Sequence, residues 1–102
     1  MLVAAEAAEE DGEASFHGDV VTAGGIGKIS SKSAVSRELA RRAALLDARR
    51  NLLIEARRIR EGVTGRKSVS GHVGYHWMVS ERRDGYLYKV TLAARLADIR
   101  VD

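Results

Sequence analysis

A run of 28 residues, Ala34–Glu61, contains neither glycine nor proline and is bounded by Ser33 and Gly62. Serine is a favourable residue at a helix N-cap, and glycine readily takes the left-handed conformation that ends a helix. The sequence therefore predicts one helix over this run, about 40 Å long at 1.5 Å per residue. In a chain of 102 residues, such a helix fixes the layout, because the remaining elements must lie along it to form a core.

The rest of the chain is typical of β-structure. Residues Phe16–Thr22 alternate in polarity, as a half-buried strand does, and we expect the glycine-rich segment Ala23–Gly27 to form a flexible turn. Residues Val69–Glu81 and Tyr86–Leu96 also alternate, and Asp84-Gly85 between them is a strong hairpin signal. The sequence thus predicts one strand before the helix and a long hairpin after it.

Pairing Arg83 with Tyr86 sets the expected register of this hairpin and places Trp77 opposite Leu92, on an apolar face that the helix would cover. A right-handed crossover then puts the third strand between the first and the second. The predicted fold class is α+β: one long helix packed on a three-stranded antiparallel sheet, in the chain order strand, helix, strand, strand and the sheet order first, third, second. We expect a single domain over residues 16–102.

Charge is distributed unevenly along the chain. Residues 1–15 contain five acids and no base, which leaves 17 bases against nine acids, a net +8, in residues 16–102. We expect the acidic segment to be a disordered tail, and its first residues resemble the end of an export signal. Three bases share one expected sheet face, which could bind nucleic acid: Arg82, Lys89 and Arg95. Stacking aromatic side chains are not expected there, because the pattern directs Trp77 towards the core.

The predicted helix has two apolar faces. At 100° per residue one stripe consists of alanines and a leucine, which suit close approach to a sheet: Ala40, Ala44, Ala48 and Leu52. A second stripe lies more than 90° away and contains Val35, Leu39, Leu46 and Leu53. Since a three-stranded sheet covers one side of a helix, we expect the second stripe to be an association face. The alternative is that the tail or residues 96–101 fold over it.

Catalytic and metal-binding patterns are weak. The chain has no cysteine, which excludes disulfides, thiolate ligands and lipid attachment through a cysteine of this chain. Residues 24–28 lack the spacing of a Walker A loop, and His72 and His76 would lie about 13 Å apart on one strand. Asp47 fits a local polar pair with Asn51 better than acid–base catalysis. We therefore expect no enzyme activity, no cofactor and no metal, and no segment reaches the 18 apolar residues of a membrane span.

Four segments resemble one family of bacterial envelope domains: residues 21–27 (VTAGGIG), 40–53 (ARRAALLDARRNLL), 71–74 (GHVG) and 79–92 (VSERRDGYLYKVTL). This family includes the twenty-kilodalton outer-membrane lipoprotein and the N-terminal domain of flagellar assembly protein T. The chain departs from it by a short connection after residue 63 and by the lack of a lipidated cysteine. The resemblance transfers no catalytic residues.

This resemblance implies an exported, non-enzymatic protein, periplasmic or associated with the outer membrane, that acts in assembly or protein–protein association as a homo-oligomer or with an envelope partner. Two alternatives remain open. One is a nucleic-acid-binding module that uses the basic sheet face. The other is a small-ligand-binding oligomer similar to dodecins, which share the order strand, helix, strand, strand, with Trp77 as the analogous flavin platform.

Overall fold

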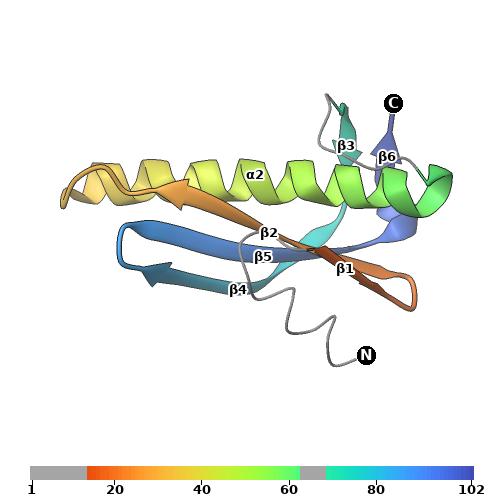
Figure 1. Ribbon diagram of the computed structural model, residues 1–102, viewed down its shortest axis with the longest axis horizontal. Helices are drawn as coiled ribbons and strands as arrows, with labels where there is room; N and C mark the ends of the chain where they lie inside the picture. The colour runs from red at the N-terminus through yellow and green to blue at the C-terminus, as the bar shows by residue number, and fades with distance from the viewer. Residues whose placement is uncertain (1–13, 63–68) are drawn as a thin grey trace.

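A long helix lies along one face of an antiparallel sheet, and a small second sheet stands at the C-terminal end of the helix (Figure 1). The computed structural model describes residues 14–62 and 69–102. In chain order the elements are β1 (Ala14–His17), β2 (Val20–Lys28), α2 (Ala34–Glu61), β3 (Gly71–Val73), β4 (His76–Asp84), β5 (Leu87–Arg95), the 3-10 turn η1 (Leu96–Asp98) and β6 (Ile99–Val101).

The predicted helix is confirmed at both ends. The Ser33 hydroxyl oxygen accepts a hydrogen bond from the backbone N–H of Ser36 at 3.1 Å, which satisfies one of the amides left unpaired at a helix start. Gly62 has a φ of 70°, and its N–H donates to the Arg58 carbonyl at 2.9 Å. These local signals were sufficient because each acts within one turn of the helix terminus.

The predicted three-stranded sheet is wrong. The main sheet has four antiparallel strands in the order β1-β2-β5-β4, and β3 pairs with β6 in a separate two-stranded sheet. A turn at Gly18-Asp19, where Gly18 has a φ of 65°, divides the expected first strand into the hairpin β1-β2. Residues 23–27, expected as a turn, lie inside β2 and pair with β5.

The glycines of β2 are present because the helix backbone lies directly on them. A Cβ atom at Gly25 would lie 2.1 Å from the Ala44 carbonyl oxygen, and one at Gly27 would lie 2.0 Å from the Ala40 carbonyl oxygen. Alanines on the facing side of α2 complete this close approach. What reads in sequence as a flexible turn is therefore the surface against which the helix packs.

The β4–β5 hairpin forms, but its predicted register is wrong. Asp84 pairs with Leu87, so the turn residues are Gly85 and Tyr86, and Gly85 has a φ of 63°. A bulge between Met78 and Ser80 then shifts the pairing by one residue. Because side chains alternate between the faces of a strand, Trp77 lies opposite Ala93 instead of Leu92, on the face away from the helix.

The expected strand over residues 69–81 is interrupted at Gly74-Tyr75. Its first part becomes β3, which pairs with β6 and lies above the C-terminal half of α2 (Figure 1). Gly74 N–H donates to the Asp98 carbonyl oxygen at 2.8 Å, which helps to hold the segment after β3 against the segment before β6.

The core has two connected parts, one between α2 and the main sheet and one beneath β3–β6. Its largest fully buried side chains are Leu52, Leu92, Ile99, Val21 and Val90.

Candidate interaction surface

The inner face of α2 is held to the sheet by small side chains. Ala40, Ala44 and Ala48 are at most 2% exposed and face β2, while Leu52 is fully buried. Alanine side chains allow helix and sheet backbones to approach closely and lose no rotamer freedom on burial. The predicted alanine stripe is therefore the packed face of the helix.

Two polar side chains of α2 bond to the backbone of β2 beyond the end of β1. Asn51 Nδ2 donates to the Gly24 carbonyl at 2.7 Å, and the Ile26 N–H donates to Asp47 Oδ2 at 3.0 Å. Because β1 pairs with β2 only as far as Ala23, these bonds satisfy backbone groups on an edge that has no strand partner in the described residues. Asp47 and Asn51, expected as a local pair, thus serve the contact between helix and sheet.

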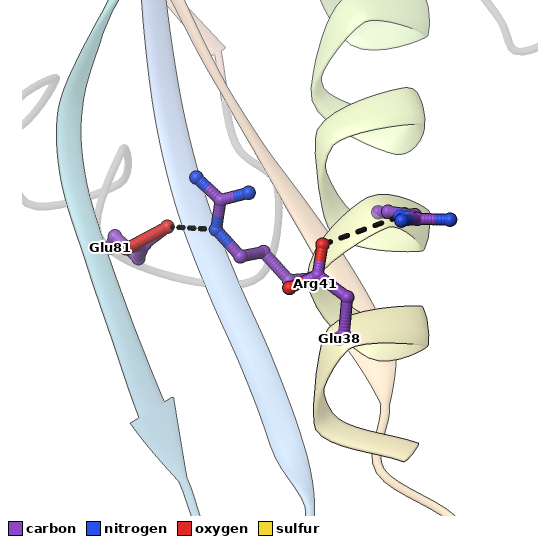
Figure 2. A network of polar contacts seen from close by, with 4 residues as sticks. Glu38, Arg41 and Glu81 are labelled. Carbon is purple, nitrogen blue, oxygen red and sulfur yellow. Dashed lines mark hydrogen bonds and ion pairs between the residues drawn. The ribbon is translucent and has the colours of Figure 1, made fainter. Parts of the chain in front are cut away.

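A third contact connects the helix to the far strand. Arg41 Nε lies 2.7 Å from Glu81 Oε1, and the arginine reaches across β5 to β4 (Figure 2). The hydrogen bond and charge of Glu81 raise the pKa of Arg41. Burial raises the pKa of Tyr88, and the nearby Glu81 carboxylate acts in the same direction. The ion pair thus adds a contact between α2 and β4 to the contacts that the buried alanines make with β2.

The outer face of α2, defined by Val35, Leu39, Ala43 and Leu46, is apolar and open to solvent. Val35 is 69% exposed, Leu39 59% and Leu46 63%, and Ala43 between them is exposed too. These positions follow each other at intervals of four, four and three residues, which places them on one side of a helix. In the described part of the chain no helix or strand packs on them.

Leu53, the fourth residue of the predicted association stripe, is covered within the monomer. It is 9% exposed and belongs to the same buried cluster as Ile99 of β6. A Cβ at Gly71 of β3 would lie 3.0 Å from Leu53 Cδ2. The C-terminal segment thus covers the last turn of the stripe, as the alternative interpretation proposed, and leaves the first three turns uncovered.

Charged side chains flank the outer face. Arg42 Nε lies 3.3 Å from Glu38 Oε2, one helical turn away. Arg49 is half-buried and Arg50 is exposed, both near the end where the β3–β6 sheet begins. An apolar stripe with a polar rim is the usual composition of a protein–protein contact.

The three residues of the predicted basic face do lie on one side of the main sheet. Arg82 pairs with Lys89, and Arg95 is six residues further along β5, about 20 Å away. The Lys89 side chain is only 17% exposed, and its Nζ lies 3.4 Å from Asp84 Oδ2. The accessible charge of this face is therefore smaller than the sequence suggests, although the bulge adds Trp77 to it.

The two histidines expected on one strand lie in different sheets. His72 belongs to β3 and His76 to β4, where His76 Nδ1 is 2.8 Å from the Gly74 carbonyl oxygen. Over residues 14–62 and 69–102, no group of three or more histidine, aspartate or glutamate side chains has the arrangement of a metal site. None of the helices described there is long and apolar enough to cross a membrane.

Comparisons with protein-family models, with curated proteins and with solved structures find no match for this chain. The outer face of α2 is therefore identified by its own geometry. The signal for it was present in the sequence as the second apolar stripe. The covering of Leu53 could not be read there, because it depends on where the chain places β3 and β6.

Proposed function

We propose that this chain is a non-enzymatic association domain of the bacterial cell envelope, and that it binds other proteins through the outer face of α2. The observation that carries the proposal is the exposure of Val35, Leu39 and Leu46, each between 59% and 69%, beside a covered Leu53 in the same stripe. Large apolar side chains gathered on one exposed face are a mark of interaction sites. The partner is a second copy of this chain or another envelope protein.

The way α2 is held supports this proposal. Bonds from Asp47, Asn51 and Arg41 connect the helix to β2 and β4, so the outer face is presented by a rigid element. A rigid surface loses less conformational entropy on binding than a mobile one. Assembly domains benefit from this property, because their contacts must form with a defined geometry.

The envelope location rests on the resemblance of residues 21–27, 40–53, 71–74 and 79–92 to the lipoprotein and flagellar family. Fractionation of cells that express the complete gene tests it directly. Recovery of the protein with periplasmic or outer-membrane markers is the expected result. Recovery with cytoplasmic markers alone would contradict the proposed location.

Association is tested by light scattering on the purified protein and two variants. We expect a mass above that of the monomer for the wild type and a lower mass for Leu46→Glu, because a buried, unpaired carboxylate disfavours an apolar contact. Val79→Glu is the matched control, since Val79 is 55% exposed and lies on β4. It should leave the mass unchanged.

Two results would contradict self-association through the outer face of α2. One is a strictly monomeric mass for the wild type and both variants over the accessible concentration range. The other is an equal loss of mass in Leu46→Glu and Val79→Glu, which would show that any association does not depend on the outer face of α2.

A further inference from the structure

The face of the main sheet that is turned away from α2 carries both cations and aromatic rings. We propose that this open sheet face binds single-stranded nucleic acid, with bases stacked on two aromatic side chains and phosphates paired with two arginines: Tyr75 and Trp77, and Arg82 and Arg95. The open sheet face lies on the opposite side of the sheet from α2. The inference therefore does not rest on the association proposed above.

The strand registers show which side chains belong to the open sheet face. A Cβ atom at Gly25 or Gly27 would meet the backbone of α2, so the residues that alternate with them along β2 point away from the helix. Their partners on β5, and the partners of those on β4, point away too. Along these three strands the open sheet face has four bases and one acid: Lys28, Arg82, Lys89 and Arg95, and Asp84. This excess of positive charge suits a polyanion.

The bulge in β4 supplies aromatic rings that the sequence pattern did not direct to this face. Trp77 pairs with Ala93 on the open sheet face. The ring centroid of Tyr75 lies 5.9 Å from that of Trp77, with 35° between the two ring planes. Tyr75 is 72% exposed and Trp77 is half-buried. One ring anchored on the sheet and one open to solvent offer two neighbouring platforms for bases, because every base has a π-face.

Cations lie on both sides of this aromatic pair along β5. Arg95 is two residues beyond Ala93, about 7 Å away, and Lys89, the partner of Arg82, is four residues before it, about 14 Å away. The central residues of the face are small: Thr22, Gly24, Thr91 and Ala93. In the described part of the chain no helix or strand packs on them. A strand of a few nucleotides can therefore lie along β5 with its bases on the rings and its phosphates near the arginines.

The chemistry of this face favours a single strand over other large ligands. A duplex keeps the faces of its bases inside the stack, so it would leave the two rings unused. A neutral glycan would leave the exposed Arg82 and Arg95 without partners. Open rings beside cations are the combination by which proteins bind single strands without reading their sequence. We expect such binding to weaken steeply with salt and to depend little on the base sequence.

Trp77 is the only tryptophan of the chain, so its fluorescence reports on the open sheet face directly. Oligothymidylate of about 12 nucleotides, titrated at low salt, should quench this fluorescence, because a stacked base contacts the indole ring. The logarithm of the affinity should fall linearly with the logarithm of the salt concentration. Duplex DNA of the same length, and heparin as a polyanion without bases, should quench less.

Matched variants separate the aromatic pair and the cations from general effects. Tyr75→Ala should weaken binding about 5- to 150-fold, the loss of about one stacked base. Tyr86→Ala should not, although Tyr86 is equally exposed at 72%. Arg95→Ala should weaken binding and reduce the salt slope by about 0.7, the value for one phosphate of a single strand. Arg100→Ala, an exposed position on β6, should change neither quantity.

Four results would overturn the inference. The first is no quenching by oligothymidylate at low salt. The second is an equal loss of affinity in Tyr75→Ala and Tyr86→Ala. The third is binding of heparin or duplex DNA as tight as that of the single strand, which would show attraction by charge alone. The fourth is quenching by a neutral oligosaccharide and not by oligothymidylate, which would assign the rings to a glycan.

This experiment is separate from the test of association. Leu46→Glu changes the outer face of α2 and should bind oligothymidylate as the wild type does, because residue 46 lies on the other side of the molecule. Tyr75→Ala should likewise leave the mass in light scattering unchanged. Failure of single-strand binding and failure of the proposed function are therefore distinguishable.

Discussion

Replacement of Gly25 by alanine should destabilise the fold far more than the addition of one methyl group ordinarily does. In an open strand the same change is favourable by roughly 0.5–1 kcal/mol, because glycine loses more conformational freedom on folding. Here the new methyl carbon would lie 2.1 Å from the Ala44 carbonyl oxygen and 2.3 Å from the Ala48 amide nitrogen. Both neighbours are backbone atoms of α2, so no side-chain rotation can relieve the contact.

The magnitude follows from the movement that the helix must make. Ordinary contact begins near 3.4 Å, so α2 and β2 would have to separate by more than 1 Å. Overpacking of this kind costs about 1–3 kcal/mol. The separation would also weaken the bonds from Asn51 to Gly24 and from Ile26 to Asp47, each worth about 0.5–1.5 kcal/mol. We expect a loss of about 3–5 kcal/mol, a large part of the stability of a domain of this size.

Urea denaturation followed by the far-ultraviolet circular dichroism of α2 measures this loss. Gly74→Ala is the matched control, because its new methyl would meet the Asp98 carbonyl oxygen at 3.3 Å and Asp98 Cβ at 3.8 Å, with no contact shorter than 3 Å, and it should cost less than about 1 kcal/mol. Adding Ala48→Gly to Gly25→Ala should not restore stability, since the atoms in conflict belong to the backbone. Equal losses for Gly25→Ala and Gly74→Ala, or rescue by Ala48→Gly, would refute the reasoning.

Three further predictions concern the helix and its surroundings. Leu53→Ala should lower the unfolding free energy by about 2–5 kcal/mol in urea titrations, whereas Leu46→Ala should change that of the monomer by less than about 0.5 kcal/mol; similar losses would contradict the assignment of inner and outer positions. Ser33→Ala should cost about 1 kcal/mol through loss of the N-cap, measured in the same way, and no change would mean that another group caps the helix. The raised pKa of Tyr88 means that the folded state holds the phenolic proton more tightly than the unfolded state. The stability that it contributes is therefore present below pH 10 and is lost as the pH rises through the folded-state pKa. The wild-type minus Tyr88→Phe difference in absorbance near 295 nm should have a midpoint above pH 10, and a midpoint at or below 10 would contradict the burial of this side chain.

Much of the candidate surface could be predicted from the sequence because it depends on a single element. The periodicity of α2 places Val35, Leu39 and Leu46 on the same side, and this relation holds wherever the helix packs. The same periodicity placed Leu53 with them. Whether each of these side chains is covered depends on other segments, and only the position of β3 and β6 separates Leu53 from the rest.

The sheet shows where a local pattern is insufficient. Residues 23–27 contain three glycines, which in isolation favour a turn, yet they form the centre of β2 because α2 lies against them and β5 pairs with them. The bulge beside Val79 leaves no distinct signal in an alternating sequence, but it moves Trp77 from the predicted core face to the opposite one. In both cases a contact between distant segments outweighs a local preference.

The sequence by itself determined the long helix, its two caps and its two apolar faces, because each depends on residues within a few turns of one another. Only the tertiary structure decided how the strands divide into two sheets, how closely α2 approaches β2, and which end of the second apolar face remains open. Those features depend on steric fit between segments that are far apart in the chain. A local propensity does not encode that fit.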